Sequence, residues 1–340
     1  MAFPASLPTL SGFPATLPLM RRLQSIPALL ILATLLGTCA SWSTPDSPGH
    51  YLADLRSTLI YEEDALDAQA NLLAIRPELY PSDYRSPEHL RLKLAAILDR
   101  ARDSGLLNEH SVVALPDQIG TWLLLDGERA ELYSARSFSE VRAWLALDNP
   151  HRLAWSWLQS EGFPGMGETL LRMKAEGMAR DYQQLFGALA REYRITLLAG
   201  SVLLPEPRLE NGNLHTGNGP LYNLAPVFGP DGHLLGPPHA QPCTTKARGQ
   251  ATVQEVQTKK IKVLVRREGC LSHSLAMTTG MKTGIALFLR GRLWPVKDLA
   301  DCCEWSAAHA PRRESAAPGS HLLNIRVTAQ SSTDLPAEGR

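Results

Sequence analysis

The sequence predicts a layered α/β fold, in which helices pack against a largely buried β-sheet. Two helix–strand units carry this prediction. Residues 86–105 have helical periodicity and precede an apolar strand at residues 112–115, and a longer helical stretch at residues 167–193 precedes an apolar strand at residues 195–200. The chain has 340 residues, of which 44% are apolar, and this is enough to bury one large core.

The two helices have clear signals of their own. Ser86 offers a capping hydroxyl before Pro87 and Glu88, and Gly105 ends the first helix. Apolar residues recur at intervals of three and four along its predicted inner face: Leu90, Leu94, Ile97 and Ala101. The second helix has a similar stripe: Leu171, Met178, Tyr182, Leu185 and Leu189.

The strand at residues 112–115 ends abruptly in Pro116, Asp117 and a turn that contains Gly120. This pattern places a carboxylate at the carboxyl end of a buried strand, where α/β folds usually build their sites. A carboxylate held there can act as a general base. A plain Pro-Asp turn after a strand accounts for the same residues, so this segment by itself leaves both interpretations open.

Further strand and turn signals follow along the chain. Residues 195–207 predict a strand that runs into a rigid turn, residues 219–228 predict another strand, and residues 230–232, Pro-Asp-Gly, predict a tight turn. Residues 138–147 and 151–158 are amphipathic. They predict a pair of packed surface helices, with a lid over a pocket or a membrane-facing surface as alternatives.

The order of these segments resembles the carbon-nitrogen hydrolase (nitrilase/amidase) superfamily over residues 51–236 and again over residues 277–295. The resemblance implies a four-layer αββα sandwich, here incomplete, and pairing into a homodimer through helices. It implies cleavage of nitrile or amide bonds by a Cys nucleophile, a Glu base and an oxyanion-stabilising Lys, with no metal or organic cofactor. A thiol needs a nearby base to become a thiolate, and the oxyanion needs a fixed positive donor.

All three catalytic positions depart from the pattern that this resemblance implies. Asp117 stands where Glu is expected, and its side chain is one methylene shorter. Gln241 stands where the Lys is expected, and Lys246 is the nearest replacement. Arg266 occupies the register of the nucleophile, and Cys270 follows it in the sequence. Since arginines close before a cysteine can lower the pKa of its thiol, Cys270 is the candidate nucleophile.

The late part of the chain is shorter than the pattern requires. Residues 260–265 predict a strand, but residues 243–257 are polar and lack periodicity, which makes them poor material for a sheet core. We infer a deletion or a shifted reading frame across residues 241–272, with loss of one or more core strands. Residues 321–327 predict one last strand before the C-terminal tail.

Two functions follow from these observations. The first is an active hydrolase of small nitriles or amides, in which Asp117 is the base, Cys270 the nucleophile, and Lys246 or Lys260 the oxyanion donor. The second is a pseudoenzyme that keeps the scaffold as a binding or structural protein without turnover. A serine hydrolase is not favoured, because the sequence has no Gly-x-Ser-x-Gly elbow.

The N-terminal residues predict a targeting segment. Arg21 and Arg22 precede an apolar run at residues 26–36, which fits a secretory signal or a short membrane anchor, and Cys39 resembles a lipidation site. A disordered leader with a chance apolar run is the alternative. We expect an exported or membrane-anchored protein with three parts: a signal or anchor at residues 1–45, the hydrolase-like domain at 46–330, and a disordered tail at 331–340.

The composition argues against several classes of protein. Lys and Arg together number 34, as do Asp and Glu, so the formal net charge is zero and nothing indicates binding to nucleic acid. The cysteines and histidines lack the spacing of a zinc site. The five cysteines permit disulfides in an exported protein, but their pairing cannot be read from the sequence.

Overall fold

A computed structural model describes most of the chain between residues 54 and 327, all within the compact unit Pro45–Arg340. The described ranges are 54–63, 69–160, 165–243, 252–267, 274–278, 285–287, 289–294 and 317–327. The predicted signal or anchor, the predicted tail, Lys246 and Cys270 lie outside these ranges. None of the helices in the described ranges combines the length and the apolar character that a membrane crossing needs.

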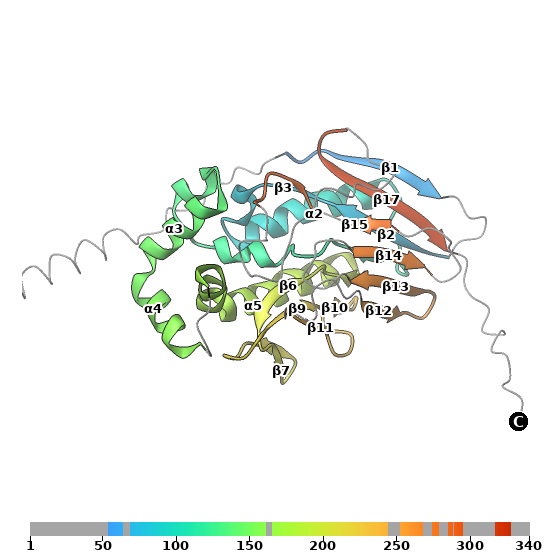
Figure 1. Cartoon of the computed structure of the whole chain (residues 1–340). Coiled ribbons are helices and arrows are strands. Elements are labelled where there is room, and N and C mark those ends of the chain that lie inside the picture. The colour runs from blue at the N-terminus through green and yellow to red at the C-terminus, as the bar shows by residue number, and fades with distance from the viewer. Residues whose placement is uncertain are drawn as a thin grey trace, which may run out of the picture. The chain divides into compact units, whose positions relative to one another are not determined.

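A six-stranded mixed sheet forms the core of this unit (Figure 1). Its strands are, in spatial order, β1 (Ser57–Glu63), β17 (Ser320–Val327), β2 (Ala70–Arg76), β4 (Val112–Ala114), β5 (Thr196–Leu198) and β10 (Val227–Phe228). Strands β2, β4 and β5 are parallel neighbours. The predicted last strand is confirmed as β17, which lies inside the sheet, parallel to β1 and antiparallel to β2.

Two smaller antiparallel sheets complete the main architecture. One has the order β11 (His239–Pro242), β9 (Leu221–Ala225) and β6 (Val202–Pro205). The other has the order β12 (Thr252–Gln257), β13 (Lys262–Arg267), β14 (Ser274–Thr278) and β15 (Ile285–Leu287). Two short pairs join β3 (Glu78–Leu79) to β16 (Arg290–Gly291) and β7 (Arg208–Glu210) to β8 (Asn213–His215).

The predicted helices are confirmed, with small shifts of their ends. They are α2 (Pro87–Asp103), α3 (Phe138–Asp148), α4 (Pro150–Gln159) and α5 (Met166–Tyr193), with short 3₁₀ helices η1 (Pro81–Tyr84), η2 (Thr121–Leu125) and η3 (Ala130–Ser134). Helix α2 begins as predicted, because the Ser86 hydroxyl accepts a hydrogen bond from the His89 amide at 3.2 Å. Helix α5 ends where Arg194 adopts a left-handed conformation, with φ of 53°.

The two faces of the central sheet are covered by different layers. On one face, Leu73 of β2 joins a cluster with Leu94 of α2 and Leu185 of α5. On the other face, Leu72 of β2 joins a cluster with Val263 of β13. Since successive residues of a strand point to opposite faces, the helices cover one face and the four-stranded sheet covers the other.

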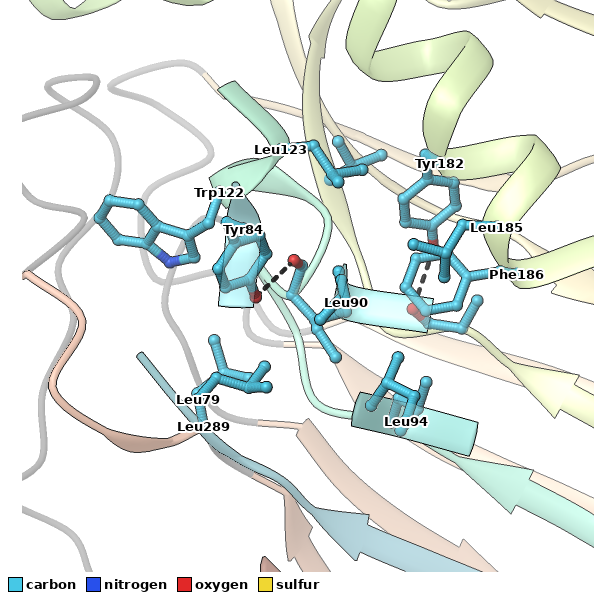
Figure 2. Packing of buried hydrophobic residues seen from close by; sticks show 14 of the residues in the cluster. Leu79, Tyr84, Leu90, Leu94, Trp122, Leu123, Tyr182, Leu185, Phe186 and Leu289 are labelled. Carbon is cyan, nitrogen blue, oxygen red and sulfur yellow. Dashed lines mark hydrogen bonds between the residues drawn. The ribbon is translucent and has the colours of Figure 1, made fainter. Parts of the chain in front are cut away.

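Tyrosines add polar anchors within the helix-side cluster, part of which Figure 2 shows. The Tyr84 hydroxyl donates to the Ile119 carbonyl at 2.9 Å, and the Tyr182 hydroxyl donates to the Ala199 carbonyl at 3.0 Å. Both rings are fully buried, and burial raises the pKa of each hydroxyl well above its usual value. These bonds tie the helix-side core to the segments that follow β4 and β5.

The α/β class is therefore confirmed, with helices on one sheet and a second sheet behind it. Helices α3 and α4 pack against α5, and the described ranges contain no α-helix besides α2 to α5. The outer helical layer of an αββα sandwich accordingly stays a prediction. The deletion inferred across residues 241–272 is also still a prediction.

The expectation that residues 243–257 are poor material for a sheet core is wrong for residues 252–257. Strand β12 pairs with β13 along its whole length, and its side chains alternate between buried and exposed. Val256 packs in the sheet-side cluster, while the Gln254 amide is buried with hydrogen-bond partners. A polar residue can face the core when its hydrogen bonds are satisfied there.

Candidate functional site

Asp117 lies where the sequence predicts it, at the carboxyl end of β4, and only 2% of it is exposed. The Leu115 amide still bonds to the Leu198 carbonyl of the neighbouring strand β5 at 2.9 Å. Pro116 then removes the next donor, and the chain leaves the sheet. Gln118 completes the turn in a left-handed conformation, with φ of 63°.

Polar side chains fix this turn from two neighbouring segments. Ser201 accepts from the Gln118 amide through its hydroxyl at 2.9 Å and from the Gly120 amide through its carbonyl at 3.0 Å. The Gln118 side chain donates to Asn223 Oδ1 of β9 at 3.1 Å. Each bond satisfies a buried polar group, so the Asp117 backbone is held rigidly.

Gly200 allows the chain after β5 to approach this turn closely. Its φ is 74°, and a Cβ atom there would lie 2.1 Å from the Pro116 carbonyl oxygen. A side chain at this position would therefore push Pro116, and with it the position of Asp117, out of place.

The charge partner of Asp117 is Arg267, which comes from the end of β13. Its Nη1 donates to Asp117 Oδ1, and the two side chains are 1% and 0% exposed. Its Nε and Nη2 both donate to Gln254 Oε1, at 3.1 and 2.9 Å. Gln254 in turn donates to the Ala225 carbonyl at 2.9 Å. The guanidinium is thus held in one orientation between two strands and the Asp117 turn.

This ion pair determines what the carboxylate can do. A guanidinium stays protonated in proteins, so it can neither give up a proton to a base nor act as a nucleophile. Asp117 Oδ1 accepts the hydrogen bond from the Arg267 guanidinium. Asp117 Oδ2 is buried and has no hydrogen-bond partner within the described residues. The desolvation of two charges offsets much of their attraction, but removing one partner would leave the other charge buried alone.

A second polar group links β11 to β12 beside the ion pair. Thr252 Oγ1 lies 2.9 Å from His239 Nε2 and donates to Gln241 Oε1 at 3.1 Å. Burial lowers the pKa of His239, and the Arg267 charge lowers it further, while Asp117 acts in the opposite direction. The ring is therefore neutral near pH 7.

A groove of about 390 Å³ lies beside these residues and exposes part of the region to solvent. His239 and Gln254 line it together with apolar side chains such as Leu235, Pro238 and Val253. The described ranges contain no group of three or more His, Cys, Asp and Glu side chains that could hold a metal ion.

The structure brings together only part of the predicted site. Asp117 is in place, but Lys246 and Cys270 lie outside the described residues, so their distance from Asp117 stays untested. Gln241, at the position expected for Lys, is buried and bonded to Thr252.

Lys260, the other candidate oxyanion donor, lies near the amino-terminal ends of the parallel strands of the central sheet, opposite the end where Asp117 lies. Its Nζ donates to Gln69 Oε1 at 2.9 Å, and Gln69 precedes β2. Because β2 and β4 are parallel, this end of β2 lies away from the carboxyl end of β4, where Asp117 is found. Lys260 is therefore not brought to Asp117.

The sequence reasoning missed Arg267. It placed Arg266 in the register of the nucleophile, but the next side chain is the one that reaches Asp117. The signal was present, because Val263 and Val265 are the buried apolar residues of β13 and Arg267 shares their face.

The chain has distant similarity to some solved structures. No protein-family model matches the sequence, and no curated protein is similar to it. Among solved structures, crystal structures of an N-terminal amidase are similar over 59% of this chain. The complex with a Gln-Gly peptide has 12% identity and a TM-score of 0.26, and the complex with a Gln-Val peptide has 11% and 0.25. The matched region spans 38% of the length of those chains.

Proposed function

We propose that this protein is a carbon-nitrogen hydrolase-like scaffold or binding protein without hydrolytic turnover. The observation that carries the proposal is the buried ion pair, in which Arg267 donates to Asp117 Oδ1. Hydrolysis by a cysteine needs an acid, a thiol and a positive donor within about 3–4 Å of one reacting carbon. A permanently protonated guanidinium at the acid opposes such an assembly.

The nature of the neighbouring residues supports the same proposal. Gln241 is neutral, and its Oε1 already accepts a hydrogen bond from Thr252, so it stabilises an oxyanion less well than a lysine would. Cys243 is the single cysteine within the described ranges, and it is disulfide-bonded, so it has no thiolate to offer.

An active hydrolase is the alternative that the experiment must address. The purified full chain is incubated with propionamide, benzonitrile and a Gln-Gly dipeptide, and released ammonia is measured. We expect no release above a protein-free control. Turnover that Cys270→Ser and Lys246→Met both abolish, and that Lys259→Met at an exposed lysine retains, would contradict the proposal.

A measurement on Cys270 itself makes the test independent of the choice of substrate. Iodoacetamide labelling at pH 7 is followed by mass spectrometry, with and without prior reduction. An activated thiolate would be labelled much faster than the same cysteine in urea, because the thiolate is the reactive form. We expect labelling no faster than in urea. A non-reducing peptide map of the same sample identifies the partner of Cys243, and a Cys243–Cys270 bond would exclude a free nucleophile.

A further inference from the structure

A second hollow, of about 360 Å³, lies between α4, the first half of α5 and the loop from β8 to β9. Trp155 and Arg152 of α4 form one side, and Met173 and Arg172 of α5 form another. Asn218 lies in the loop that closes it. None of its lining residues belongs to the Asp117 cluster. Its volume lies in the range of small-molecule sites, which is about 300–1,000 Å³.

The walls of this hollow are fixed by hydrogen bonds. Arg172 Nη1 donates to the carbonyls of Asn218 and Gly219, at 2.8 and 2.9 Å, and so attaches the loop to α5. The same guanidinium is held by Glu168, at 3.1 and 2.6 Å, and its side chain is 8% exposed. The Ser156 hydroxyl donates to the Thr169 carbonyl at 3.3 Å, which attaches α4 to α5. The hollow is therefore formed before any ligand arrives.

The lining has a one-sided chemistry. Among the residues that the structure describes, the lining contains the cationic side chains of Arg152 and Arg172 together with His151, and none of these described residues is Asp or Glu. Glu168 compensates the charge of Arg172, whereas Arg152 forms no ion pair within the described residues and interacts electrostatically with Glu128 without direct contact. Trp155 is 63% exposed, and α4 buries none of its residues. An exposed indole beside a guanidinium is complementary to a flat apolar group that carries a negative charge.

We propose that this hollow binds a small aromatic carboxylate, with its ring against the indole of Trp155 and its carboxylate toward Arg152. The planar guanidinium can bond both oxygens of a carboxylate at once. This site does not depend on the chemistry of Asp117. A binding measurement therefore tests it separately from the hydrolytic activity considered above.

The test uses 2-naphthoate as the probe and equilibrium dialysis of the full chain as the measurement. We expect saturable binding with a dissociation constant of about 1 mM or tighter. The neutral analogue 2-naphthamide should bind about tenfold more weakly, because it loses a charge-assisted hydrogen bond. Arg152→Glu should weaken 2-naphthoate by about tenfold or more, and Trp155→Ala by about fivefold. Both positions are exposed, so both variants should keep the fold, which circular dichroism checks.

Arg100→Glu is the matched control, because Arg100 is exposed on α2 and does not line the hollow. It should leave binding of 2-naphthoate unchanged. Equal affinity for the acid and the amide would overturn the proposal. So would equal binding by Arg152→Glu and Arg100→Glu, or no saturable binding in the millimolar range.

Discussion

The two sides of the Asp117 cluster are built from different kinds of sequence. On the acid's side, β4, β5 and β6 are buried along their whole length, and glycine, proline and serine shape the turns between them. On the opposite side, β12 alternates between exposed and buried residues, and polar side chains such as Gln254 and Arg267 face inward. One set of residues therefore positions the carboxylate of Asp117, while another set determines what that carboxylate contacts.

The ion pair that joins the two sides should give the largest effect when it is broken. Arg267→Met leaves the Asp117 carboxylate buried without its charge partner, so we expect a loss of about 3–5 kcal/mol in the free energy of unfolding. Urea denaturation followed by circular dichroism measures this loss. The double variant Asp117→Asn with Arg267→Met should recover most of it, because no uncompensated charge remains.

An exposed arginine provides the control for this experiment. Arg326 pairs with Glu62 at 2.8 Å, and their side chains are 42% and 32% exposed. Arg326→Met should cost less than about 1 kcal/mol, since surface ion pairs contribute little. If Arg267→Met cost no more than Arg326→Met, the buried pair would not join the two sides as described.

The sequence predicted the acid's side better than the opposite side. The helices α2 and α5 have regular apolar stripes and the strands after them are short apolar runs, so local pattern was sufficient to find them. The turn around Asp117 was marked by Pro116 and Gly120, because proline and glycine commonly form turns where a strand ends.

Contacts between distant segments were not predictable in the same way. Strand β17 lies between β1 and β2, and Arg267 meets Asp117 across 150 positions of sequence. Local periodicity says which residues share a face of a strand, but it does not say which strands become neighbours or in what register. In β13 the sequence pattern placed Arg266 in the register of the nucleophile, but it did not indicate that the buried Arg267 would meet Asp117.

A substitution on the acid's side tests whether the turn geometry holds the carboxylate. Gly200→Ala introduces a Cβ that would lie 2.1 Å from the Pro116 carbonyl oxygen, at a φ of 74°. Gly212→Ala is the matched control, because φ is 80° there but a Cβ would meet nothing within 4 Å. We expect Gly200→Ala to cost about 1–3 kcal/mol more than the control in urea denaturation, since only it adds a steric overlap. Equal losses would mean that the close approach does not matter.

A smaller effect is expected at the start of α2, which covers the acid's side of the sheet. Ser86→Ala removes the hydroxyl that accepts from the His89 amide, and we expect a loss of about 1 kcal/mol. Ser104→Ala, at the exposed other end of the same helix, should change stability by less than about 0.5 kcal/mol. Thermal unfolding of both variants measures the difference. An equal effect at both ends would show that the capping bond contributes nothing.

A pH-dependent effect is expected at Asp126, which follows η2 on the acid's side. Burial raises its pKa to about 6, and nearby Asp181 raises it while Lys174 lowers it. The folded state therefore holds this proton more tightly than the unfolded state, so the stabilisation is complete below about pH 4 and is lost as the pH rises through 6. Asp126→Asn removes the titration, and we expect it to raise the melting temperature relative to the unmodified chain at pH 7.5, to raise it less at pH 5, and to change it little below about pH 4. A gain for Asp126→Asn that grew on acidification would contradict the buried, proton-retaining environment described for this carboxyl group.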